Sequence, residues 1–222
     1  IVPSAILFDL GIGEREVRPD SESGYHACEF ASSDPVEQGT VGAGTGATVG
    51  KTRGPQRSVK GGLGSASIDL GEGLLVGALV VVNAIGSVHD PGNGSLIAGP
   101  RINKSMSSSI DDLISGNSFK LPDINGNTTI GVVATNAKLT KAQATRMAAS
   151  SHDGLALAIR PSHLIGDGDT MFSISTGEQG GIDGYGDMNR IIAGAIQTVS
   201  LAIVNAINFA ETIGGIPSVK DL

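Results

Sequence analysis

The stretch GNTTIGVVAT, from Gly126 to Thr135, joins a turn to a strand in this sequence. Residues 123–126 (Asp-Ile-Asn-Gly) are typical of a turn, and the β-branched run after them predicts a strand. A threonine at such a junction can attack the peptide bond before it. Its hydroxyl takes the acyl group from the nitrogen, and water completes the cut. The new chain would begin at a threonine whose free α-amine lies beside its own hydroxyl, a known way to activate a weak nucleophile.

The tetrad Asn127-Thr128-Thr129-Ile130 also has simpler interpretations. Asn-Thr-Thr is a glycosylation sequon, and a threonine after a turn is an ordinary start for a strand. Taken alone, the four residues favour these interpretations. The chemical case for catalysis after the cut rests on the new α-amine, whose ordinary pKa of about 7.7–8 leaves a useful fraction as a neutral base near neutral pH.

Composition describes a protein with one sizeable core. The chain has 222 residues, of which 40% are hydrophobic and 17% charged, and this suits a single domain spanning residues 1–222. Its 33 glycines follow no three-residue period, which excludes collagen. The formal net charge of −7, without a long basic run, argues against nucleic acid as a partner. No continuous apolar run reaches about 18 residues, so no membrane partner is expected.

The single cysteine, Cys28, excludes an internal disulfide and favours a reducing, cytoplasmic location. As a small apolar side chain it is expected in the core rather than as a catalytic thiol. The sequence begins at Ile1 instead of a methionine. We therefore expect that a segment upstream of this chain is missing.

Apolar periodicity predicts strands followed by helices. Strands are expected at residues 5–10, 66–70, 74–83, 129–135 and 170–176, and helices at 25–32, 140–159 and 189–209. Thr140 is the expected N-cap of the second helix, and Gly154 is a point at which that helix could break. Between residues 87 and 127 only a short helix at 110–114 is expected, within a long loop of a kind that is usually functional or mobile.

Several polar residues lie where chemistry would need them. Lys51 ends a glycine-rich segment that misses the phosphate-loop spacing, because Thr45 stands where a glycine is required. Asn83 ends the apolar run, where it either caps the strand or donates to a developing oxyanion. Asp167 and Asp169 precede a strand, as a plain turn or as two carboxylates directed at a nucleophile.

Six blocks of sequence, taken in order, resemble the self-cleaving L-aminopeptidase/D-Ala-esterase/amidase family, which includes β-aminopeptidases and nylon-oligomer hydrolases. They are PSAILFDL (3–10), GAGTGATVGK (42–51), KGGLGSAS (60–67), VGALVVVNAIG (76–86), GNTTIGVVATNAKLTK (126–141) and DGDTMFSIST (167–176). Each block alone is modest, but the ordered set is specific and spans most of the chain.

The resemblance implies an α+β fold, an αββα sandwich like that of the N-terminal-nucleophile hydrolases and close to ornithine acetyltransferase. It implies cleavage between Asn127 and Thr128, which would give pieces 1–127 and 128–222, and a homo-oligomer of cut protomers. The nucleophile maps to Thr128. The other catalytic residues of the nylon-oligomer branch map to Lys51, Asn83, Asp167 and Asp169.

One position departs from the family pattern. Several members carry a tyrosine in the first block, thought to contact the substrate or the oxyanion, and here that position is Phe8, which has no hydroxyl. The resemblance therefore places Phe8 at the substrate and implies a different substrate preference.

These observations lead to the hypothesis of an autoproteolytic hydrolase that cleaves amide bonds of small peptides or amino-acid amides. No metal or organic cofactor is expected, because the four histidines show no metal-ligand spacing. Two alternatives stay open: an acyltransferase of the ornithine acetyltransferase type, and a catalytically inactive binding protein of the same fold.

Overall fold

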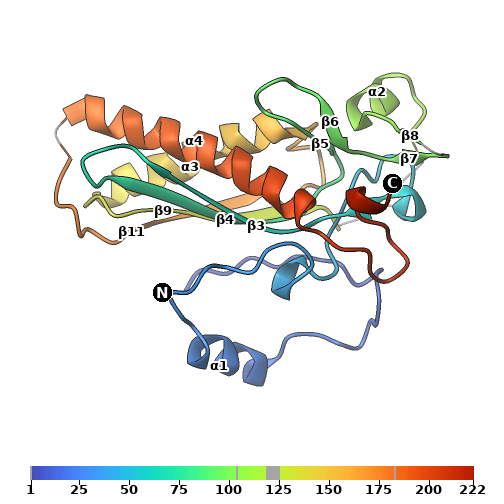
Figure 1. Ribbon diagram of the computed structural model, residues 1–222, viewed down its shortest axis with the longest axis horizontal. Helices are drawn as coiled ribbons and strands as arrows, with labels where there is room; N and C mark the ends of the chain where they lie inside the picture. Colours follow the sequence, from blue (N-terminus) through green and yellow to red (C-terminus); the bar gives the residue numbers. More distant parts are fainter. Residues whose placement is uncertain (1, 104, 119–125, 183) are drawn as a thin grey trace.

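A mixed four-stranded sheet forms the centre of the computed structural model, which describes residues 2–103, 105–118, 126–182 and 184–222 (Figure 1). The strand order is β11-β9-β4-β3, with bounds Thr170–Ser175, Thr128–Thr135, Leu75–Asn83 and Gly62–Asp69. β3 and β9 pair antiparallel with β4, and β11 runs parallel to β9. The four strands expected from residue 66 onward are therefore confirmed.

Helices α3 (Lys141–Ala158) and α4 (Gly184–Asn208) lie over the same face of this sheet (Figure 1). The alternate residues of β4 that face them are almost completely buried: Val76, Ala78, Val80 and Val82. The expected N-cap of α3 is confirmed, because the Thr140 hydroxyl accepts from Gln143 N and the Gln143 side chain accepts from Thr140 N.

Two glycines let α4 approach its neighbours at backbone distance. A Cβ on Gly64 of β3 would lie 1.9 Å from the Ala202 carbonyl oxygen, and one on Gly154 of α3 would lie 2.5 Å from the Ile196 carbonyl oxygen. Gly154 therefore does not break α3. It lies inside the helix, where the missing side chain makes room for α4.

α4 is long and apolar enough to cross a membrane by length and composition alone. Its apolar residues instead form the centre of the core, with Ile191, Ala195, Val199 and Ile203 all fully buried. The core helix of a globular protein passes the same composition test, so the helix is weak evidence for a membrane span.

The described residues cover the opposite face of the sheet only in part. Leu79, Val132 and Phe172 lie side by side across β4, β9 and β11 and are half-buried. Ile174 on the same face is 52% exposed. The expected α+β class is confirmed, and these residues display one helical layer and one sheet of a layered arrangement.

The segment after residue 86 is not the structureless loop that was expected. Its described part contains β5 to β8 and the short helix α2, with bounds Ser87–His89, Leu96–Ala98, Arg101–Ile102, Ser105–Met106 and Ser109–Ile114. β5 pairs with β6 and with β10 (Ile159–Arg160), and β7 pairs with β8. Strands of two or three residues are too short for periodicity to reveal. Most of the expected turn at 123–126 lies outside the described residues.

A two-stranded ribbon carries the glycine-rich segment. β1 (Thr48–Val49) pairs antiparallel with β2 (Val59–Lys60), and a short 3₁₀ helix (Pro55–Arg57) connects them. Two further 3₁₀ turns span Gly42–Gly44 and Val219–Asp221.

The first part of the chain packs little against this core. Helix α1 (Ser21–Glu29) confirms the helix expected at 25–32 but begins earlier, because the Asp20 carboxylate accepts from Ser23 N as its N-cap. None of its residues is buried.

Two expectations for this part of the chain are wrong. Residues 5–10 form no strand, since Ile6 is 85% exposed and the segment has no strand partner among the described residues. Cys28 is exposed, not in the core. It lies on α1, which buries no face, and its apolar character therefore has no core to join.

Candidate active site

Strands β4 and β9 bring Asn83 and Thr128 together. The last residue of β4 is the Cα partner of the first residue of β9. Directly opposite residues of an antiparallel pair point to the same face, so both side chains lie on the face away from α3 and α4. Asn83 is 1% exposed and Thr128 is 8% exposed. A buried polar pair on adjacent strands needs polar neighbours, and the loops around it supply them.

Lys51 reaches this point from the segment after β1. Its Nζ donates to Asn83 Oδ1 at 2.7 Å, to Asn83 O at 3.1 Å and to Gly126 O at 3.2 Å. Its backbone N donates to Ile85 O at 3.0 Å, which fixes the segment along the end of β4. A lysine this deeply buried is costly unless its ammonium is hydrogen-bonded, and here three acceptors surround it.

The Asn83 amide uses both of its ends. Oδ1 accepts from Lys51 Nζ and from Thr48 N, while Nδ2 donates to Gly126 O at 3.0 Å and to Phe8 O at 3.1 Å. Lys51 and Asn83 thus converge on one carbonyl, that of Gly126. The amide is fully satisfied, as a buried side chain of this type requires.

The Asn127 carbonyl is held beside the Thr128 hydroxyl. Thr128 Oγ1 donates to Asn127 O at 2.6 Å, and Gly168 N donates to the same oxygen at 2.9 Å. Asn127 is 5% exposed, and this burial disfavours the sequon interpretation, since glycosylated asparagines lie on the surface. The buried Asn127 Oδ1 and Thr129 Oγ1 have no hydrogen-bond partner among the described residues.

The carboxylates of Asp167 and Asp169 lie on the loop before β11, and each accepts a hydrogen bond from a different backbone N–H. Asp169 Oδ1 accepts from Thr129 N at 2.8 Å, next to the candidate nucleophile. Asp167 Oδ2 accepts from Leu164 N at 2.8 Å. A parallel bridge between Asn127 and Asp167 holds this loop along the start of β9. The Asp167 carboxylate thus makes a local hydrogen bond of the kind found in turns, whereas the Asp169 carboxylate reaches the start of β9.

Burial changes the protonation of two groups at the site. It lowers the pKa of Lys51 to about 7, against the opposing influence of the Asp167 and Asp9 charges. It raises the pKa of Asp167 to about 6, helped by the Asp169 charge and opposed by the Leu164 hydrogen bond and by Lys51. Both pKa values therefore lie near neutrality, the range that suits general acid–base groups.

The structure adds residues that sequence patterns did not single out. Gly168 lies so close to the nucleophile that a Cβ there would be 2.9 Å from Thr128 Oγ1. His163 Nδ1 lies 3.1 Å from Asp169 Oδ2, and its φ of 59° is left-handed, which is uncommon for a histidine. The imidazole also contacts His152, with ring centroids 5.1 Å apart. A histidine and a glycine in a loop carry no spacing signal, so only the fold reveals them.

The first block contributes backbone and charge rather than a strand. The Phe8 carbonyl oxygen accepts a hydrogen bond from Asn83 Nδ2, and Phe8 as a whole is 47% exposed. The carboxylate of Asp9 fills the space beside Gly46, where a Cβ would overlap it, and its charge favours protonation of Lys51 and Lys60. Contact of the Phe8 ring with substrate stays a prediction. No group of three metal-ligating side chains occurs among the described residues.

Comparison with solved structures places the architecture. The L-aminopeptidase D-Ala-esterase/amidase from Ochrobactrum anthropi, described as a variant of the Ntn hydrolase fold, superposes with a TM-score of 0.61 at 22% identity. The match covers 88% of this chain and 51% of that one. The class is therefore the N-terminal-nucleophile hydrolase type of fold, with the polar cluster at the end of β4 and β9.

The family follows from the sequence match. The model of peptidase family S58 matches residues 1–220, and the chain belongs to that family. An uncharacterized aminopeptidase of Mycobacterium leprae is 38% identical over 98% of this chain and 64% of its own length. A 6-aminohexanoate-oligomer endohydrolase of a Kocuria species is 30% identical over 80% of this chain and 50% of its own length. The chain thus spans about half to two thirds of the relatives it matches.

Proposed function

We propose that this chain is part of an autoproteolytic hydrolase with an N-terminal threonine nucleophile, which cuts itself between Asn127 and Thr128 and then cleaves amide bonds. The contact of the Asn127 carbonyl with both Thr128 Oγ1 and Gly168 N carries this proposal. The nucleophile and a donor for the developing negative charge already flank the bond to be broken. Family membership supports the same chemistry.

Self-cleavage proceeds as an acyl shift. Thr128 Oγ1 loses its proton and bonds to the Asn127 carbonyl carbon, the carbon–nitrogen bond breaks, and the nitrogen takes up a proton. Water then hydrolyses the ester, leaving a carboxylate on Asn127 and a free amine on Thr128. No α-amine exists before the cut, so Asp167 accepts the first proton. Its pKa of about 6 keeps it ionised at neutral pH yet basic enough to serve.

In the uncut chain, a carbonyl of the chain itself accepts the hydrogen bonds that a substrate would need. Lys51 Nζ and Asn83 Nδ2 both hold Gly126 O, the carbonyl one residue before the cut. Departure of the new end at Asn127 would free both donors for the carbonyl of an external substrate. The Thr128 α-amine then serves as the base for the second reaction, with Lys51 and Asn83 facing the oxyanion.

The substrate class follows from the relatives' names. Those names, aminopeptidase and 6-aminohexanoate-oligomer endohydrolase, describe cleavage of peptide or linear amide bonds. We propose the same broad class here, small peptides or linear amides, acted on by a domain cut into 1–127 and 128–222. Assembly of several cut protomers belongs to the same proposal.

Mass spectrometry and N-terminal sequencing of the full-length protein test the proposal. The wild type should yield a piece that begins at Thr128, Thr128→Ser should also cut, and Thr128→Ala should stay one chain. The p-nitroanilides of small amino acids and a 6-aminohexanoate oligomer then report turnover. Scission in Thr128→Ala, or turnover by a wild-type protein that remains uncut, contradicts the mechanism.

A further inference from the structure

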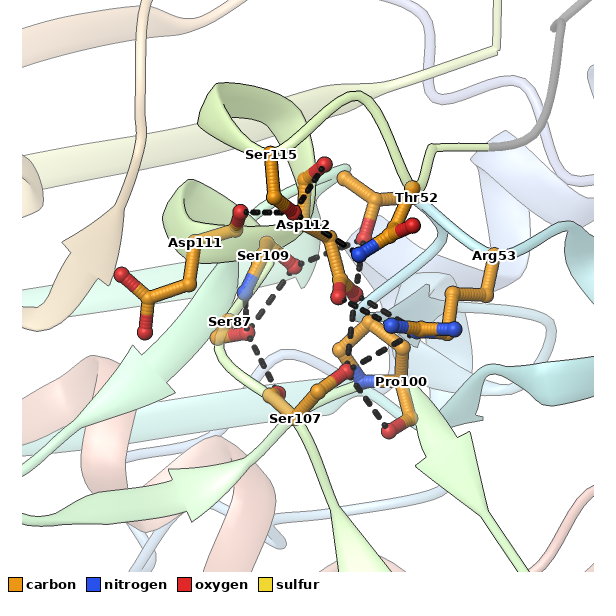
Figure 2. Close-up of polar contacts among 10 residues, drawn as sticks. Thr52, Arg53, Ser87, Pro100, Ser107, Ser109, Asp111, Asp112 and Ser115 are labelled. Atoms are coloured by element: carbon orange, nitrogen blue, oxygen red, sulfur yellow. Dashed lines mark hydrogen bonds and ion pairs between the residues drawn. The ribbon is translucent and has the colours of Figure 1, made fainter.

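A second polar cluster shares no residue with the candidate active site around Thr128. Its centre is Asp112 of α2, which is 3% exposed (Figure 2). Arg53, two residues after Lys51, donates to it twice: Nη2 to Oδ1 at 2.5 Å and Nε to Oδ2 at 2.9 Å. Ser107 Oγ donates to Asp112 Oδ2 at 2.7 Å. The two-point ion pair fixes the plane of the Arg53 guanidinium.

Serine and threonine hydroxyls tie this ion pair to the core. Thr52 Oγ1 lies 3.3 Å from Asp112 Oδ2, Ser87 Oγ donates to Ser109 Oγ at 2.9 Å, and Ser109 N donates to Ser87 Oγ at 2.8 Å (Figure 2). All three of these hydroxyl residues are buried. Arg53 is therefore held by a packed network, not by a flexible surface contact.

A second arginine is oriented by backbone carbonyls. Arg101 Nη2 donates to Gln56 O at 2.5 Å, and its Nε donates to Ser58 O at 3.1 Å. These two bonds use part of its donor fork and leave other N–H groups available. The backbone N of Arg57, in the short 3₁₀ helix between β1 and β2, donates to Gly54 O at 3.0 Å, while its exposed side chain makes no hydrogen bond or ion pair with any described residue.

The three arginines line one cavity of about 260 Å³. The remaining lining comes from Ile102, Asn103, Asn117 and Ser118. One carboxylate, that of Asp112, pairs with a guanidinium of the lining, so two positive charges stay uncompensated there within the described part of the chain. The whole sequence carries a formal net charge of −7. The positive charge around this cavity is therefore opposite in sign to the net charge of the protein.

We propose that this cavity is a binding site for a small oxyanion with two or more negative charges, separate from the amide-cleaving site. Guanidinium groups bind carboxylate and phosphate oxygens through paired N–H donors, and the asparagine amides add further donors. The volume is below the range of about 300–1,000 Å³ usual for drug-sized ligands, so a compact anion fits. The Arg57 side chain lines the cavity and has its guanidinium donors available for the anion.

Phosphate-type and carboxylate ligands share this chemistry, and the experiment separates them. Isothermal titration of the full-length protein with pyrophosphate, and in a second arm with citrate, is run at constant ionic strength set with sodium chloride. Saturable binding in at least one arm is expected, and the stronger arm names the ligand class. Heat that fails to saturate in both arms, or that equimolar chloride reproduces, overturns the proposal.

Matched variants test the residues. Arg57→Gln removes an exposed side chain without disturbing the Asp112 network, and it should weaken binding by about tenfold or more, since a charged hydrogen-bond donor contributes about 1.5–3 kcal/mol. Arg146→Gln, at an exposed position of α3, should leave the affinity unchanged. Equal affinity of Arg57→Gln and wild type would show that the anion binds elsewhere and would overturn the assignment. Neither substitution touches the self-cleaving residues, so failure here is distinct from failure of the proposed hydrolase.

Discussion

Asn83 and Thr128 are cross-strand partners, the last residue of β4 opposite the first residue of β9. The pairing puts an amide and a hydroxyl on the same side of the sheet at its edge. Lys51 comes to this end of the strands from a segment before β4 in the sequence, and the loop with Asp167 and Asp169 comes from a segment after β9. The β4–β9 register therefore assembles the site, because a shift by one residue would turn one of the two side chains to the helix-covered face.

Replacing Asn83 tests the oxyanion role. Asn83→Ala removes the partner of Lys51 and one of the two donors on the Gly126 carbonyl. Loss of one oxyanion donor typically slows a reaction about 100- to 1,000-fold, so we expect turnover of a p-nitroanilide to fall by that order. Asn205→Ala is the control, because it removes a partly buried amide bonded to Ser65 O on the far side of β3. Equal activity of the two variants would contradict the role of Asn83.

The rate of self-cleavage should depend on pH in a bell-shaped manner. The rate rises through about pH 6 as Asp167 loses its proton and becomes able to accept another, and it falls above about pH 7 as Lys51 loses its charge. Quenched gel time courses of freshly refolded protein from pH 5 to 9 provide the measurement. A rate that keeps rising beyond pH 8 would show that neutral Lys51 is the active form.

Lys51 should also change the pH dependence of stability. Burial lowers its pKa from 10.5 to about 7, so between these values the unfolded chain holds a proton that the folded chain lacks. The free energy of unfolding contributed by this group therefore increases with pH across that window. Chemical denaturation at pH 7 and pH 9.5 should show the increase in Thr128→Ala, used here as an uncut background, and should show a smaller one when Lys51→Met is added. An identical increase in both would mean that Lys51 is not the responsible group.

Gly168 should be intolerant of any side chain. A Cβ at this position would lie 2.9 Å from Thr128 Oγ1 and would displace the hydroxyl from the Asn127 carbonyl. A misplacement of about 1 Å at a reacting centre can cost about 100-fold in rate, so Gly168→Ala should slow self-cleavage by that order. Gly166→Ala, in open space on the same loop but at a φ of 92°, controls for general loop strain. Unchanged scission in Gly168→Ala would show that the contact is not formed.

His163 should tune the pKa of Asp167. His163→Asn removes the imidazole beside Asp169 while asparagine tolerates the left-handed φ. The His163 charge lowers the pKa of Asp167, so its loss should move the acid limb of the rate profile to higher pH. His26→Asn on the exposed helix α1 should not move it. If the rate of self-cleavage falls while the acid limb of its pH profile stays at the same pH, His163 has a purely structural role.

Gly64 tests the packing of α4 on the sheet. A Cβ there would lie 1.9 Å from the Ala202 carbonyl oxygen and 2.5 Å from Ala206 N, so Gly64→Ala must push the helix away from β3. Overpacking of this kind typically costs about 1–3 kcal/mol, and thermal unfolding should report a lower midpoint. Gly24→Ala on α1, where nothing lies within 4 Å, should not lower it.

Sequence patterns predicted the central strands and both long helices, because their apolar periods extend over enough residues to be recognised. They were wrong for residues 5–10, which contact Asn83 and Gly46 without pairing as a strand, and for Cys28, which lies on a helix that buries no residue. The strands of residues 87–106 were missed, because a two- or three-residue strand exists through its partner and not through its own composition.

The sequence by itself determined the local elements and marked the Asn127–Thr128 junction, since turn chemistry and β-branched runs act over short stretches of chain. Only the tertiary structure decided that Lys51 and Asn83 share the Gly126 carbonyl, that Gly168 N holds the Asn127 carbonyl, and that His163 contacts Asp169. The physical reason is that a backbone N–H or C=O is the same in almost every residue, so the sequence does not reveal which of them bind at the site. The burial that lowers the pKa of Lys51 likewise comes from segments that are distant in the chain.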